Sequence, residues 1–253
     1  MVKISTSPRS PLSPKRWPAE SFRWYWSLGF ALLVLGAQFV PFALFAAALL
    51  VFGIAVERDF RMLSWPLLTA TFVSYAVALA LVFGLLPLLA QRSLRELGLR
   101  APRLGDLGWG IGGAIAMVGV AAAVGSLQEH VLHLKADEVQ VHMLRAARGS
   151  LVAGFVFLAC IAAPFFEELS FRGFLFNALL RYLPMWLAVV LSGTLFGLAH
   201  WLPGNLGAIV PLAAVGMVLA GIYYRTASLA AAMLAHAFFN SLTVVTVLVF
   251  HQL

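Results

Sequence analysis

The chain has 253 residues, of which 62% are apolar and only 11% are charged, and its formal net charge is +7. Apolar runs of this length exclude a soluble globular core, and because they are continuous rather than alternating they also exclude an outer-membrane barrel. The excess of Lys and Arg is not a nucleic-acid footprint, because these residues gather in the N-terminal tail or flank apolar segments. The composition predicts an all-α polytopic membrane protein, a bundle of seven or eight transmembrane helices.

The chain divides into three parts in this interpretation. Residues 1–21 are rich in Ser, Pro and basic residues, which predicts a disordered cytoplasmic tail. Residues 22–148 contain the N-terminal transmembrane helices, and residues 149–253 form a helical core that carries the candidate site. The single cysteine, Cys160, excludes an intrachain disulfide.

Seven apolar segments are long enough to cross a bilayer: 27–56, 64–90, 107–127, 150–182, 185–201, 206–223 and 228–250. The fourth is longer than the hydrocarbon thickness requires, and Pro164 predicts a kink or break within it. A cytoplasmic N-terminus would place twelve of the seventeen Lys and Arg inside, as the positive-inside rule favours. We therefore expect the N-terminus inside. The Ser- and Pro-rich tail and the lack of organelle-retention signals fit a bacterial inner membrane. If the first or fourth segment is split and crosses twice, the resulting eighth crossing would place the C-terminus on the opposite side of the membrane.

The segment 128–148 is the one sizeable polar connection after the tail, and it has enough Val and Leu to form an interfacial helix. His130 and His133 have the spacing of a metal site, but no third ligand completes the set, so a solvated connection is the preferred interpretation. Tyr223, Tyr224 and Trp201 are expected in the aromatic belt at the membrane surface.

Two adjacent acids, Glu167 and Glu168, are the only acids in the long apolar segments. A charge at the bilayer centre costs roughly 2.5–3.5 kcal/mol even on lenient insertion scales, so such residues usually have a function. Arg172 lies one helical turn after Glu168 and predicts an ion pair with it. Glu167 is left without an evident partner, which makes it the first functional candidate.

Three further polar side chains interrupt the apolar helices: His200, which is paired with Phe196 one turn earlier, and the pair His236 and Asn240. Each pair is four residues apart and so shares a helical face. Counting 1.5 Å per residue from turns near 183 and 226 places these groups and Glu167 at a similar depth.

Such a cluster suits amide hydrolysis by an activated water: a glutamate as general base, histidines that orient water or move a proton, and an amide that donates to an oxyanion. The chain has no HExxH motif, no GxSG serine motif and no GxGD aspartate motif. The nucleophile is therefore expected to be water rather than a side chain.

Three motifs carry a resemblance to a known family. EELSFR (167–172) is similar to the EExxxR motif of the CAAX protease and bacteriocin-processing family, FGLAH (196–200) to its FxxxH motif, and HAFFN (236–240) to its HxxxN motif. The motifs occur in family order within about 150–250. The resemblance implies an intramembrane glutamic protease, like the type II CAAX prenyl endopeptidases, that acts on a membrane-associated or lipid-modified peptide or protein.

The resemblance also implies roles for individual residues. Glu167 would be the general base, His200 would help to activate the water, and His236 and Asn240 would form the oxyanion site. Glu168 and Arg172 would be a supporting pair, while Phe196 is expected to pack. We favour a reaction without a cofactor, and zinc remains the alternative, since Glu and His are also zinc ligands.

Two other classes of protein stay open at this stage. A proton-coupled transporter would also bury Glu and His, although the chain shows no repeat symmetry. A non-catalytic bacteriocin-immunity protein of the same fold is the other alternative, although every motif position is intact.

Overall fold

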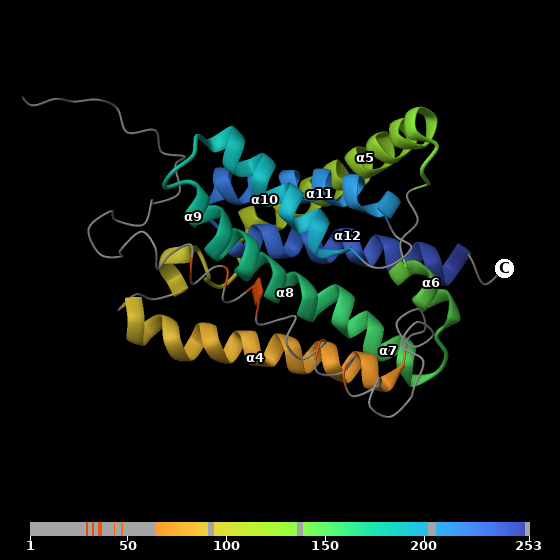
Figure 1. Cartoon of the computed structure of the whole chain (residues 1–253), viewed down its shortest axis with the longest axis horizontal. Coiled ribbons are helices and arrows are strands. Elements are labelled where there is room, and N and C mark those ends of the chain that lie inside the picture. Colours follow the sequence, from red (N-terminus) through yellow and green to blue (C-terminus); the bar gives the residue numbers. More distant parts are fainter. Residues whose placement is uncertain are drawn as a thin grey trace, which may run out of the picture.

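The computed structural model describes residues 64–90, 94–135, 139–201 and 206–250, together with six separate helical positions before residue 64. The predicted tail, and the predicted span 27–56 apart from those six positions, lie outside the described residues. Every regular element in the described ranges is a helix (Figure 1). The predicted fold class, an all-α polytopic membrane protein, is confirmed.

The elements follow the predicted spans closely. They are α4 (Trp65–Ala90), η1 (Leu94–Leu97), α5 (Leu104–Leu132), α6 (Val139–Ala146), α7 (Ser150–Phe157), η2 (Leu158–Ala162), α8 (Ala163–Glu168), η3 (Leu169–Phe176), α9 (Asn177–Leu179), α10 (Met185–Ala199), α11 (Leu206–Thr226) and α12 (Leu229–Phe250). Five stretches are long and apolar enough to cross a membrane: Trp65–Gly84, Leu104–Leu132, Ser150–Leu179, Leu206–Thr226 and Leu229–Phe250. The protein is therefore an integral membrane protein, in which α10 is a shorter apolar helix.

The third membrane helix extends further than the sequence predicts. The segment 128–148 was expected to be a polar connection, but α5 continues to Leu132. Gln128 explains the extension, because its buried side-chain amide donates to the carbonyls of Leu134 and Gly207, at 3.0 and 2.8 Å. A polar group satisfied in this way does not have to end an apolar helix. The remaining connection contains the short helix α6.

The fourth membrane helix does not break at Pro164 and is helical from Ser150 to Leu179. Instead, the turn before the proline is a wider π-helix, η2, in which the Ala163 N–H donates to the Leu158 carbonyl. Proline lacks an N–H, and its ring clashes with the carbonyl four residues earlier, so a wider turn accommodates it without a break. A second π-helix, η3, follows the two glutamates.

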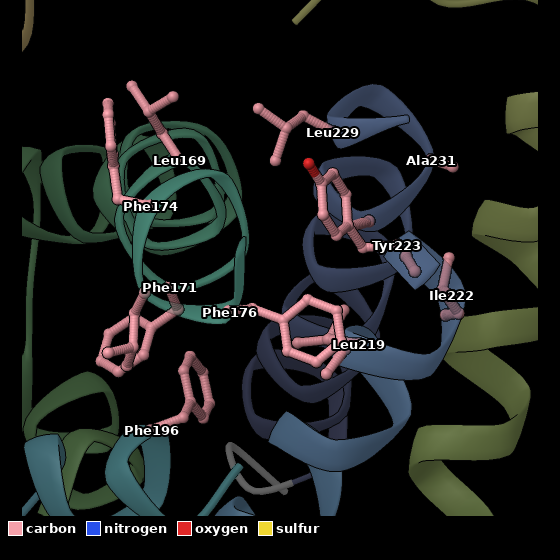
Figure 2. Packing of buried hydrophobic residues seen from close by; sticks show 14 of the residues in the cluster. Leu169, Phe171, Phe174, Phe176, Phe196, Leu219, Ile222, Tyr223, Leu229 and Ala231 are labelled. Carbon is pink, nitrogen blue, oxygen red and sulfur yellow. The ribbon is translucent and has the colours of Figure 1, made fainter. Parts of the chain in front are cut away.

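The centre of the molecule is packed between η3, α10, α11 and α12, as the cluster in Figure 2 shows. Glycines bring α10 and α11 close together: a Cβ atom on Gly197 would lie 2.5 Å from the Ile209 carbonyl oxygen, and one on Gly193 would lie 2.5 Å from the Met217 Cγ. This close packing fixes where the C-terminal end of α10 lies.

The aromatic-belt prediction was wrong for Tyr223, which is 2% exposed and belongs to this central cluster. Its hydroxyl donates to the Leu97 carbonyl at 2.9 Å and accepts from the Asn177 amide at 2.7 Å. A tyrosine near a helix end can thus serve to hold a neighbouring segment, here η1, rather than to contact lipid headgroups.

Candidate active site

The two adjacent glutamates lie at the end of α8 and point in different directions. Successive residues of a helix are separated by about 100° around its axis. The side chain of Glu168 is 0% exposed, whereas that of Glu167 is 12% exposed and lines a cavity. The sequence gives the two residues the same chemistry, and the helix places them in different surroundings.

Glu168 is fully buried, and one of its two oxygens has two hydrogen-bond donors. Its Oε1 atom accepts from Arg172 Nη1 and from His236 Nδ1, both at 3.0 Å. Arg172 is fully buried, donates through Nη2 to the Gly216 carbonyl at 2.8 Å, and lies over the Phe196 ring at 4.6 Å. The predicted Glu168–Arg172 pair is present, and His236 is an additional partner that the sequence did not indicate.

Glu167 has one engaged oxygen and one unengaged oxygen. Its Oε1 atom accepts from the Tyr75 hydroxyl at 3.1 Å. Its buried Oε2 atom accepts no hydrogen bond from the described residues. This oxygen lies 3.7 Å from His200 Nε2 and 4.0 Å from His236 Nε2. The carboxylate therefore faces both imidazoles at distances that one small molecule can bridge.

The hydrogen bonds on the far side of each imidazole determine where its protons lie. His200 Nδ1 lies 2.8 Å from the Phe196 carbonyl oxygen, which can only accept, so Nδ1 carries the hydrogen. The neutral ring then presents a lone pair on Nε2 toward Glu167. His236 Nδ1 likewise donates to Glu168, which leaves its Nε2 directed at the same oxygen of Glu167.

Asn240 and Phe196 complete this end of the cavity. Asn240 lines the cavity, and its Nδ2 atom donates to the Ala159 carbonyl in η2 at 2.7 Å. The Phe196 ring lies 4.6 Å from the His200 ring and 5.8 Å from the His236 ring. The expected packing role of Phe196 agrees with this position. Its carbonyl and its ring also orient His200 and Arg172.

The cavity has a volume of about 610 Å³ and is lined by α4, α6, α10, α11, α12 and the helix that contains the glutamates. Glu167 and the residues around it form its polar wall. The wall toward α6 is mainly apolar, because Leu144, Phe155, Val244 and Val247 pack there as a cluster, and Gln140 adds one polar side chain to it. A cavity of this size and lining fits a small molecule or a short peptide segment with an apolar portion.

Sequence reasoning missed Tyr75, the one described residue that hydrogen-bonds to Glu167. The available signal was a tyrosine near the middle of the apolar segment 64–90, far from either membrane surface, where tyrosines usually have a polar partner. The three-part division of the chain also placed the whole site in residues 149–253. The structure adds α4 and α6 to the walls of the cavity.

Within the described ranges, no group of three or more His, Cys, Asp and Glu residues is arranged to hold a metal ion. His130, one of the two histidines weighed as metal ligands, has its Nδ1 atom 2.8 Å from the Ser126 carbonyl oxygen. That nitrogen bonds to its own helix.

The site thus places a carboxylate and two oriented imidazoles together in the lining of one mainly apolar cavity, inside membrane helices. Residues 149–242 match the family described as "Type II CAAX prenyl endopeptidase Rce1-like". This match confirms the resemblance read from the three motifs and assigns the segment that contains them to the CAAX protease family. The family suggests CAAX-type endopeptidase activity. No curated protein and no solved structure matches the chain.

Proposed function

We propose that the protein is an intramembrane endopeptidase that hydrolyses a peptide bond of a membrane-associated or lipid-modified substrate with a water molecule activated by Glu167. One observation carries the proposal. The unengaged oxygen of Glu167 faces the Nε2 atoms of His200 and His236 at 3.7 and 4.0 Å, inside a cavity whose other walls are mainly apolar.

In the proposed reaction, Glu167 Oε2 takes one proton from water, while the second hydrogen stays on the water oxygen and donates a hydrogen bond to His200 Nε2, which orients the molecule. The water oxygen forms a bond to the carbonyl carbon of the substrate, and the carbonyl oxygen becomes an oxyanion. The C–N bond then breaks, and Glu167 returns its proton to the leaving amine. The products are a carboxylic acid and an amine, so that the atoms and the charge balance.

His236 and Asn240 are proposed to stabilise the oxyanion. The bond between His236 Nδ1 and Glu168 fixes the ring so that Nε2 faces the cavity, and in its protonated form Nε2 would donate to the oxyanion. Asn240 uses one amide hydrogen on Ala159 and has a second one for the substrate. The site thus contains a base, an orienting imidazole and two donors, a set that is sufficient for the reaction without a cofactor.

The experiment compares cells that contain the wild-type protein with cells that contain Glu167→Gln, and it identifies new protein termini in their membrane fractions. Loss of a general base typically costs a factor of about 10²–10⁴ in rate. We expect at least one terminus that depends on Glu167. The control is Glu129→Gln, which makes the same chemical change at an exposed position of α5. The same set of protein termini in the membrane fractions of wild-type and Glu167→Gln cells would overturn the proposal.

A further inference from the structure

Among the described residues, Tyr75 is the one whose side chain donates a hydrogen bond to Glu167. It lies on α4, outside the family match, which begins at residue 149. We infer that Tyr75 is a positioning residue that engages Oε1 of Glu167 and so directs Oε2 toward the two histidines. This inference rests on the proposed function, since it concerns the orientation of the proposed general base.

Tyr75 is itself held in place by packing. Its ring stacks on Phe166, with ring centroids 4.4 Å apart and an interplanar angle of 24°. Phe166 is buried, directly precedes Glu167 and packs with Ala78 of α4. The donor and the acceptor therefore sit on a single interface between α4 and α8, so the hydroxyl cannot move independently of the carboxylate's backbone.

A hydrogen bond at this place removes a degree of freedom that matters for catalysis. The terminal torsion of a glutamate is broad and roughly two-fold, so the carboxylate plane alone has little preference. With Oε1 held at 3.1 Å from the Tyr75 hydroxyl, Oε2 is the oxygen that faces the imidazoles. Fixing the base before the substrate arrives lowers the reorganisation that the reaction requires.

Few titratable groups surround this carboxylate. Among the described residues that line the cavity they are Tyr75 on α4, His200 on α10 and His236 on α12. Glu168 contacts His236 from the same helix as Glu167. A change in the pH dependence after removal of the Tyr75 hydroxyl can therefore be assigned to this small set.

The test is Tyr75→Phe in the full-length protein, which retains the ring stacked on Phe166 and removes only the hydroxyl. Its substrate is a quenched peptide that spans the cleavage site identified with Glu167→Gln. We expect kcat to fall by about tenfold to a hundredfold, as misplacement of a reacting group by about 1 Å does, while KM changes by less than about threefold. The kcat–pH profile is measured in parallel, because the hydroxyl that is removed is in direct contact with the proposed base.

Two companion variants separate positioning from packing. Ser74→Ala removes a neighbouring buried hydroxyl, which donates to the Ala70 carbonyl of its own helix, and it should behave as the wild type. Glu167→Asp shortens the side chain by one methylene, which withdraws the carboxylate from the Tyr75 hydroxyl. Combining it with Tyr75→Phe should lower kcat no further than Glu167→Asp alone, as expected of two residues that act through one contact.

The outcomes distinguish this inference from the proposed function. If Tyr75→Phe has the wild-type kcat and pH profile while Glu167→Gln is inactive, the inference fails and the proposed function stands. An equal loss of kcat in Ser74→Ala would show that α4 packing is responsible, which also overturns the inference. Activity retained in Glu167→Gln would remove the general base and with it the proposed function.

Discussion

The surroundings of Glu167 and Glu168 differ more than those of most neighbouring residues. Around Glu168, an arginine, a histidine and a backbone carbonyl form a packed polar network that joins η3, α11 and α12. Around Glu167, one tyrosine supports the carboxylate from behind, and the other oxygen faces a cavity. Each carboxylate has one oxygen that accepts no hydrogen bond from the described residues. Glu168 is fully buried, whereas Glu167 lines the cavity in which a substrate would bind.

The difference indicates how a membrane protein can contain a reactive carboxylate. The network around Glu168 holds His236 in one orientation, and the same His236 contributes to the wall that faces Glu167. Charge in the packed region thus determines the geometry of the cavity region. Changes in the packed region should act mainly on stability, and changes in the cavity region should act mainly on rate.

The largest expected effect on stability comes from Arg172→Met, which leaves Glu168 buried without its cation. Removing one partner of a buried pair typically destabilises by about 3–5 kcal/mol. Denaturant unfolding of the purified protein in detergent measures this loss. The matched control is Glu167→Gln, whose amide oxygen can still accept from Tyr75, and it should change the free energy of unfolding by no more than about 1 kcal/mol. An equal loss of unfolding free energy in Arg172→Met and Glu167→Gln would contradict the view that the packed region determines stability and the cavity region determines rate.

Asn240→Ala tests the cavity region. Removal of one oxyanion donor costs a factor of about 10²–10³ in kcat, equivalent to about 2.7–4 kcal/mol. The loss of its bond to Ala159 should cost only about 0.5–1.5 kcal/mol of stability. Single-turnover kinetics and unfolding, measured on the same preparation, separate the two effects. Ser241→Ala, whose hydroxyl bonds to Ala237 on its own helix, is the control and should change neither. A variant that loses stability but not rate would make Asn240 a packing residue.

A smaller effect is expected from Gly197→Ala at the interface between α10 and α11. The added Cβ atom would lie 2.5 Å from the Ile209 carbonyl oxygen and 2.8 Å from the Ala213 nitrogen, which are backbone atoms that cannot turn aside. Overpacking typically costs about 1–3 kcal/mol. Because His200 follows three residues later, kcat should fall as well. Gly112→Ala on α5, where nothing lies within 4 Å, is the matched control and should be neutral or slightly stabilising.

The smallest expected effect is that of metal removal. Because the base, the orienting imidazole and the two donors suffice for the proposed reaction, exhaustive chelation should leave kcat unchanged. Elemental analysis of the active, chelated protein checks that no metal remains. Zinc present at one ion per chain, whose removal abolishes cleavage and whose return restores it, would replace the glutamic mechanism with a metalloprotease mechanism.

Sequence reasoning predicted the helices better than it predicted the contacts. The limits of the apolar segment 64–90 differ by one residue from those of α4, because the length of an apolar run is a local property. The Glu168–Arg172 pair was also accessible, since a spacing of four residues on a helix predicts it. The α5 extension could not be predicted, because it depends on Gln128 bonding to Gly207, 79 residues away in the chain.

Contacts around the candidate site follow the same division. Counting residues from the turn predicts a similar depth for Glu167 and His200. In the structure, Glu167 Oε2 lies 3.7 Å from His200 Nε2. The Tyr75–Glu167 bond joins residues 92 positions apart, and the Glu168–His236 bond joins residues 68 positions apart. No periodicity reports which of several buried acids meets which distant donor, so the distant partners Tyr75 and His236 could not be predicted from the sequence.

The wide turns on either side of α8 also bear on how this chain tolerates insertions and deletions. A π-turn contains one residue more than an α-turn, and its wider path absorbs that residue within the stretch 158–162. Deletion of one residue there would restore a regular turn and leave α8 in nearly the same rotational phase relative to α7. Deletion of one residue from the regular turns of α7 would instead rotate α8 by about 100°, so that the acid that now faces the cavity would face another direction. A deletion scan through 151–162 should therefore find that the loss of one residue preserves cleavage better within the π-turn than before it.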